Sequence, residues 1–147
     1  MSEAGVVRIG VAGAMGRMGR VVAGLVAESP ELELAALFDR PDAAGQSLDG
    51  RRLSDAQTAL GLCEVVVDFS TGAASAALAR LAAGRGGVAL VIGSTGMSAD
   101  EERAVQDAAG RIAIVKSGNF SLGVNLLLGL VRQAARALPA ADYDIEV

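Results

Sequence analysis

The 147-residue sequence contains no histidine, no tryptophan and only one cysteine. A single cysteine excludes disulfide bonds within the chain and is typical of a reducing compartment, so we expect a cytoplasmic protein. Without histidine, the chain lacks the side chain that most often transfers protons near neutral pH. We therefore assign no catalytic residue to it, and no metal ligand.

A surplus of basic charge and long apolar runs are also missing. With 13 basic and 17 acidic residues the net charge is −4, which gives no basic surface for a nucleic-acid backbone. No apolar run reaches the ~20 residues that a membrane span needs. The N-terminal string MSEAG lacks the basic segment of a signal peptide. We expect a soluble protein whose partner is a small molecule, with no nucleic acid and no membrane.

Short apolar runs alternate with helical stretches along the chain. Five runs are nearly continuous in hydrophobicity, which is typical of parallel strands covered on both faces; they begin at Val6, Leu32, Glu64, Val88 and Ile112. Four stretches are long enough for helices. One of these has Ser98 and Glu101 at the spacing of a capping box, and the last, predicted over residues 122–138, has Ser121 as its cap.

This alternation predicts an α/β fold with a Rossmann-type, doubly wound parallel sheet. We expect one domain over residues 1–141, with residues 39–55 as a connecting loop inside it. Residues 142–147 have the pattern expected for the first residues of a further strand.

Three glycines mark the junction of the first strand and the first helix. Gly13, Gly16 and Gly19 form a G-x-x-G-x-x-G string, and without Cβ atoms they permit a tight turn and a close backbone approach. The N–H groups of such a turn lie at the positive end of the helix dipole and suit a diphosphate. Arg17 and Arg20 oppose that dipole unless an anion is bound, and Arg17 is the better candidate for a phosphate contact. A tight turn that binds nothing is the alternative.

Residues after the other strands support a dinucleotide. Asp39 follows the second strand, where a carboxylate accepts hydrogen bonds from the ribose hydroxyls of NADH, whereas the neighbouring Arg40 suits the 2′-phosphate of NADPH. Both cofactors therefore stay open. Three more polar segments follow strands at the same sheet edge: 68–71 (DFST), 93–96 (GSTG) and 117–121 (SGNFS). For the last two, turn formation and helix capping are the alternative.

The strings VAGAMGRMGR, VVVDFST, VIGSTG and SGNFSLGVNLL together resemble 4-hydroxy-tetrahydrodipicolinate reductase, also called dihydrodipicolinate reductase, of bacterial lysine and diaminopimelate biosynthesis. The resemblance implies an oxidoreductase that uses NADH or NADPH to reduce a small dicarboxylate heterocycle to tetrahydrodipicolinate. It implies cofactor contacts from Gly13, Ala14, Met15, Gly16, Arg17 and Met18 at the diphosphate, from Asp39 and Arg40 at the adenosine ribose, and from Gly93, Ser94, Thr95, Ser117, Gly118, Asn119 and Phe120 at the nicotinamide end.

The sequence also departs from the family. Members continue beyond a string like YDIEV into a histidine-rich stretch with a lysine, which supplies the general acid and binds the substrate, and then into a second domain that builds a homotetramer. Residues 142–147 would begin that domain, so the resemblance implies a cofactor-binding portion that is inactive alone. Met15 stands where many members have glycine, and Thr71 where some have arginine. Another small Rossmann oxidoreductase and a non-catalytic dinucleotide-sensing module stay open as alternatives.

Overall fold

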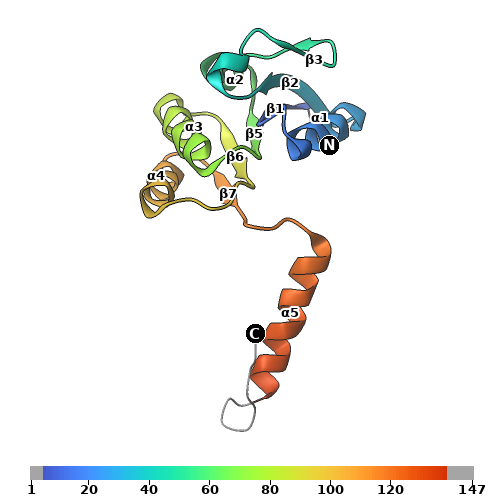
Figure 1. The fold of residues 1–147 in the computed structure, drawn as a ribbon, viewed down its shortest axis with the longest axis vertical. Coiled ribbons are helices and arrows are strands. Elements are labelled where there is room, and N and C mark those ends of the chain that lie inside the picture. Colours follow the sequence, from blue (N-terminus) through green and yellow to red (C-terminus); the bar gives the residue numbers. More distant parts are fainter. Residues whose placement is uncertain (1–4, 139–147) are drawn as a thin grey trace. The chain divides into compact units, whose positions relative to one another are not determined.

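The computed structural model describes residues 5–138, which form two units divided between Ser117 and Gly118. The first unit is built on a five-stranded parallel sheet in the order β2-β1-β5-β6-β7 (Figure 1). Its strands are β1 (Val7–Ala12), β2 (Leu32–Phe38), β5 (Val65–Asp68), β6 (Ala89–Ile92) and β7 (Ile114–Lys116). The chain winds from β1 to β2 on one side and to β5 on the other, so the predicted Rossmann-type sheet is confirmed, with its switch point between β1 and β5.

Helices pack on both faces of this sheet because successive strand residues point to opposite faces. Val66 of β5 joins a core cluster with residues of α2 (Ala56–Leu62), α3 (Gly72–Arg85) and α4 (Ala99–Ala109). Its neighbours Val65 and Val67 pack against the second cluster, to which α1 (Arg17–Glu28) contributes. Figure 1 shows α3 and α4 side by side, and these two helices are in extensive contact.

Residues 39–55, predicted as a connecting loop, contain more structure than expected. A 3₁₀ turn at Pro41–Ala43 is followed by β3 (Ser47–Leu48) and β4 (Arg51–Arg52), which pair antiparallel. Asp49 and Gly50 both have positive φ, as a tight hairpin turn requires. Leu48 and Leu53 of this segment also fill the core on the α1 face. The prediction of a plain loop is therefore wrong in part.

Helix α2 was not predicted from the sequence. It begins after Asp55, whose carboxylate accepts hydrogen bonds from the Thr58 hydroxyl (2.7 Å) and the Thr58 N–H (2.8 Å). Both hydrogen bonds lower the pKa of Asp55, and the bond from the Thr58 hydroxyl has the larger effect. After the helix, Cys63 packs under β1 so closely that a Cβ on Gly10 would lie 2.6 Å from its Sγ. Burial raises the pKa of the Cys63 thiol to about 11, so the thiol is protonated at neutral pH.

The second unit contains α5 (Leu122–Ala137). Ser121 caps it as predicted, with its side chain accepting from the Val124 N–H. The strand start predicted at residues 142–147 lies outside the described residues. None of the helices in the described part of the chain has the length and hydrophobicity that crossing a membrane requires.

The predicted capping box of α4 is present and gives a first test. The Ser98 hydroxyl accepts from the Glu101 N–H (3.3 Å), and the Glu101 carboxylate accepts from the Ser98 N–H (2.7 Å). Ser98→Ala removes one of these bonds, so we expect the free energy of unfolding in urea to fall by ~1 kcal/mol. Ser98→Thr keeps the acceptor and serves as the control. Equal stability of the Ala variant and the wild type would contradict the assignment.

Candidate functional site

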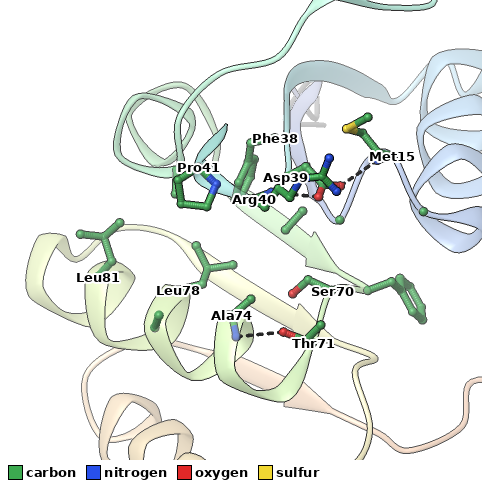
Figure 2. Close-up of a pocket in the computed structure, with 16 residues that line it drawn as sticks. Met15, Phe38, Asp39, Arg40, Pro41, Ser70, Thr71, Ala74, Leu78 and Leu81 are labelled. Carbon is green, nitrogen blue, oxygen red and sulfur yellow. Dashed lines mark hydrogen bonds between the residues drawn. The ribbon is translucent and has the colours of Figure 1, made fainter. Parts of the chain in front are cut away.

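A cleft of about 660 Å³ opens at the carboxyl ends of β1 and β5 (Figure 2). This is the switch point of the sheet, where open α/β sheets bind their ligands. Five residues predicted at the cofactor site line the cleft together, although they come from two separate segments: Gly13, Met15, Gly16, Asp39 and Arg40. The structure therefore brings together five of the eight residues predicted for the diphosphate and ribose ends, and Ala14, Arg17 and Met18 do not line the cleft.

The three predicted glycines have different roles in the turn between β1 and α1. Gly13 has φ +71°, and a Cβ there would lie 2.8 Å from the carbonyl oxygen of Phe69. A Cβ on Gly19 would lie only 2.1 Å from the carbonyl oxygen of Gly13. Gly16 is exposed, and the nearest atom to a Cβ there would be 3.2 Å away. Gly13 and Gly19 are thus required by the fold, whereas a Cβ at Gly16 would meet only the Gly13 carbonyl oxygen, which would have to shift slightly.

Three of the N–H groups predicted to hold a diphosphate are already engaged within the protein. The acceptors are the Phe38 carbonyl for Ala14 (3.2 Å), the Asp39 carboxylate for Met15 (2.9 Å) and the Gly13 carbonyl for Gly16 (3.0 Å). Ala14 is also fully buried. These bonds fix the shape of the turn, so donors for an anion have to come from farther along the chain.

The first turn of α1 supplies such donors. Gly16 is the N-cap of α1, no side chain caps the helix, and its first turn contains no acidic residue. By contrast, side chains cap α2, α3, α4 and α5. The first N–H groups of a helix have no partner inside it, and Arg17 and Met18 contribute two of them. The positive end of α1 is therefore left open beside the cleft.

Asp39 connects the end of β2 to the glycine turn (Figure 2). Its Oδ2 accepts from the Met15 N–H (2.9 Å), and its Oδ1 accepts from the Arg40 N–H (2.8 Å). Sequence reasoning located Asp39 but missed its bond to Met15. Each carboxylate oxygen has a second lone pair, so Asp39 can still accept hydrogen bonds from a ligand.

The charge of Arg40 is offset by an acidic residue that the sequence reasoning did not consider. Its guanidinium Nε lies 2.9 Å from Oδ1 and 3.0 Å from Oδ2 of Asp42. Both side chains are mostly exposed, so solvent screens this ion pair. Asp39 and Arg40 line the cleft, whereas Asp42 does not.

One wall of the cleft is apolar and was missed entirely. Ala74, Ala77, Leu78 and Leu81 of α3 line it, at the i, i+3, i+4, i+7 spacing of one helix face. Figure 2 shows Leu78 and Leu81 rising from α3 toward Pro41 on the opposite side. That spacing was the available signal in the sequence. A wall with no polar side chain suits a flat, weakly polar group such as a heterocyclic base.

The predicted residues after β6 do not line the cleft. The ring of Phe69 lies over Gly93, where a Cβ would be 2.2 Å from a ring carbon. Ser94 is 5% exposed, and its hydroxyl oxygen lies 2.6 Å from that of Ser75. Thr95 is exposed. This segment is therefore held against β5 and α3, beside the cleft.

The last predicted segment spans both units. The Ser117 N–H donates to the Ile92 carbonyl (3.1 Å) at the edge of the sheet. Gly118, Asn119 and Phe120 belong to the second unit. There the Asn119 carboxamide oxygen accepts from the Ser121 N–H (2.7 Å), directly before α5. Turn formation is thus present at Asn119 and helix capping at Ser121, and the cofactor contacts of this segment stay a prediction.

Comparison with known proteins points to one family. The family model described as "Dihydrodipicolinate reductase, N-terminus" matches residues 7–120. The chain is 54% identical to the 4-hydroxy-tetrahydrodipicolinate reductase of Caulobacter vibrioides, over 96% of this chain and 53% of that protein. It is 41% identical to the enzyme of the same name from Nitrosomonas eutropha, over 95% of this chain and 55% of that protein. The chain thus spans about half the length of the curated relatives it matches.

Solved structures share the fold. A dipicolinate-bound dihydrodipicolinate reductase from Paenisporosarcina sp. TG-14 has a TM-score of 0.72 at 20% identity, over 88% of this chain and 54% of that one. RSP, a Rex-family repressor solved in complex with β-NADH, has a TM-score of 0.59 at 13% identity, over 90% of this chain and 62% of that one. At these identities the likeness concerns the fold alone.

The glycine turn gives a second test, within one helix. Gly19→Ala places a Cβ against the Gly13 carbonyl, so α1 must shift, and we expect the free energy of unfolding to fall by ~1–3 kcal/mol. Gly24→Ala is the matched control, because no atom lies within 4 Å of a Cβ there. It should raise stability by up to ~1 kcal/mol. Urea unfolding of both variants measures the difference, and equal effects would contradict the close approach at Gly19.

Proposed function

The chain belongs to the dihydrodipicolinate reductase family, and from this premise we propose that residues 1–141 are the cofactor-binding domain of a 4-hydroxy-tetrahydrodipicolinate reductase. The enzyme would use NADH or NADPH to form tetrahydrodipicolinate in lysine and diaminopimelate biosynthesis. The observation that carries the proposal is the uncapped N-terminus of α1, which borders the cleft at the switch point through Gly16.

The order of chemical groups along the cleft matches the adenosine and diphosphate portion of a dinucleotide. Its volume of about 660 Å³ lies in the range of small-molecule sites. The first turn of α1, with Arg17 and Met18, would hold the diphosphate beside Gly16, where a Cβ would intrude. Asp39 would accept hydrogen bonds from the adenosine ribose, and the apolar wall of α3 would receive the adenine. The bound cofactor would supply the hydride.

The nicotinamide end would extend toward Gly93–Thr95 and the segment from Ser117 to Phe120, as the resemblance implies. We propose that substrate binding and proton transfer require groups that this chain does not carry. Its relatives are about twice as long, and the chain contains no histidine to serve as a general acid. With such groups present, the reductase would bind its dicarboxylate substrate and form a homotetramer.

Gly16→Val tests the proposed cofactor site. Gly16 has φ −73°, which valine can adopt once the Gly13 carbonyl 3.2 Å from its Cβ shifts slightly, and the valine side chain would cover the first turn of α1. We expect the dissociation constants of NADH and NADPH to rise at least about tenfold, a loss of ~1.4 kcal/mol or more. Calorimetric titration measures the constants, and far-ultraviolet circular dichroism checks the fold. Gly24→Val, in the same helix, should bind as the wild type does. Unchanged binding by Gly16→Val would mean that the cofactor lies elsewhere.

The ion pair between Arg40 and Asp42 predicts the cofactor preference. Asp42 draws the Arg40 guanidinium away from a 2′-phosphate, so we expect NADH to bind more tightly than NADPH. Asp42→Asn should improve NADPH binding relative to NADH by about threefold to fivefold, since an exposed pair is worth up to ~1 kcal/mol. High salt should reduce this gain.

Asp49→Asn is the matched control for that variant. It removes the same charge from an acid that lies near Arg20 (3.7 Å) and does not line the cleft. Its ratio of NADPH to NADH affinity should equal that of the wild type. An equal change in both variants would show an effect of net charge instead of a release of Arg40.

A further inference from the structure

Asp68 is a buried carboxyl group that the proposed cofactor contacts do not use. It ends β5, beside the cleft, and its side chain is fully buried (0% exposed). Within residues 5–138 no arginine or lysine forms an ion pair with it. A buried charge without a cation is costly unless hydrogen bonds replace its hydration, and an apolar side chain often serves stability better. Packing alone therefore does not explain why an aspartate occupies position 68.

The hydrogen bonds to Asp68 come from serine residues. Its Oδ1 accepts from the Ser70 N–H (2.9 Å) and the Ser70 hydroxyl (2.5 Å). Its Oδ2 accepts from the Ser75 hydroxyl (2.5 Å), whose oxygen lies 2.6 Å from that of Ser94. Each of these bonds places an N–H or O–H group against a carboxyl oxygen of Asp68.

Counting protons fixes the direction of this chain of hydroxyl groups. A serine hydroxyl has one proton, and Ser75 donates it to Asp68. Ser75 can therefore only accept from Ser94, so the single hydroxyl proton of Ser94 is also used inside the protein. Its side chain has none left to donate to a ligand. The network runs from Ser94 through Ser75 to Asp68, and so joins the end of β6 to α3 and β5.

The segment that this network holds lies between two glycines. It is bounded by Gly93 and by Gly96, which has φ +73°, and glycine loses more conformational freedom on ordering than any other residue. The Gly93 N–H donates to the Asp68 carbonyl (2.8 Å), which fixes only the first residue. The hydroxyl network adds a second attachment at Ser94. Asp68 thus limits the positions that residues 93–95 can adopt.

We propose that Asp68 is a positioning residue for the nicotinamide end of the cofactor and acts through Ser75 and Ser94. It holds residues 93–95 in the arrangement that receives the ring, and Ser94 belongs to this tether and does not donate its hydroxyl to the ligand. The inference rests on the proposed function, because it takes residues 93–95 to border the nicotinamide.

The test compares NADH with ADP-ribose, which has both phosphates and the adenosine but no nicotinamide. Ser75→Ala removes the middle hydroxyl of the network in the 147-residue chain. We expect the dissociation constant of NADH to rise about tenfold and that of ADP-ribose to change less than about twofold, since the α1 end and Asp39 are untouched. The fluorescence of bound NADH should also shift toward that of the free cofactor.

Two further variants separate positioning from general stability. Ser94→Ala breaks the network at its other end and leaves the bond from Ser75 to Asp68 in place, so it tests the inference if Ser75→Ala does not fold. It should show the same selective loss of NADH binding. Ser98→Ala weakens the cap of α4 without touching the network, and its ratio of NADH to ADP-ribose affinity should match the wild type.

The outcomes distinguish this inference from the proposed function. If the wild type binds both ligands and the serine variants lose both equally, or lose neither, Asp68 contributes only to stability and the inference is overturned. If the wild type binds neither NADH nor ADP-ribose, the proposed function fails and the inference fails with it. A loss confined to NADH supports both.

Discussion

Contact between main-chain atoms at the turn from β1 to α1 is the constraint on which the site depends. Gly13 lies against the backbone of Phe69 after β5, and Gly19 lies against Gly13 itself. No side chain fits at either contact, so α1 begins directly at the ends of β1 and β5. This places an uncapped helix end at the switch point of the sheet formed within residues 5–138, where the chain continues from β1 to β2 on one side and from β5 to β6 on the other. The cleft follows from that placement.

The two sides of the cleft offer different chemistry. On the side of the glycine turn lie helix N–H groups and the carboxylate of Asp39, which both shapes the turn and keeps acceptor capacity. On the side of α3 lie aliphatic side chains such as Leu78 and Leu81. A ligand with an anionic centre, a hydroxylated ring and a flat base would match these surfaces in turn. The proposed dinucleotide has this composition, which is why the fold and the family lead to the same proposal.

The sequence was sufficient for features that depend on local patterns. Apolar runs located the five strands of the sheet, and capping residues such as Ser98 and Ser121 located helix starts. Helix α2 was not predicted because it has only seven residues and carries no clear amphipathic period. The burial of Leu48 could not be predicted either, because the core cluster that it joins includes residues of α1, which is distant in the sequence.

Contacts between distant residues explain the remaining differences at the site. Asp39 could be located from its position after a strand, but its bond to Met15 joins two segments and leaves no local pattern. The same holds for Ser94, whose partner Ser75 lies on another element. The glycine spacing predicted a turn that binds an anion. It could not reveal that Ala14 and Gly16 use their N–H groups within the protein, which moves the open donors into the helix.

Cys63 gives this domain an internal reporter of opening. It is the only thiol in the sequence, it lies under Gly10 of β1, and burial keeps it protonated. A maleimide or disulfide reagent can reach such a sulfur only after β1 and the end of α2 separate. The rate of alkylation would therefore measure how often β1 and the end of α2 separate, and no labelling site would have to be introduced by mutation. Ligands that hold the strand ends together would slow it.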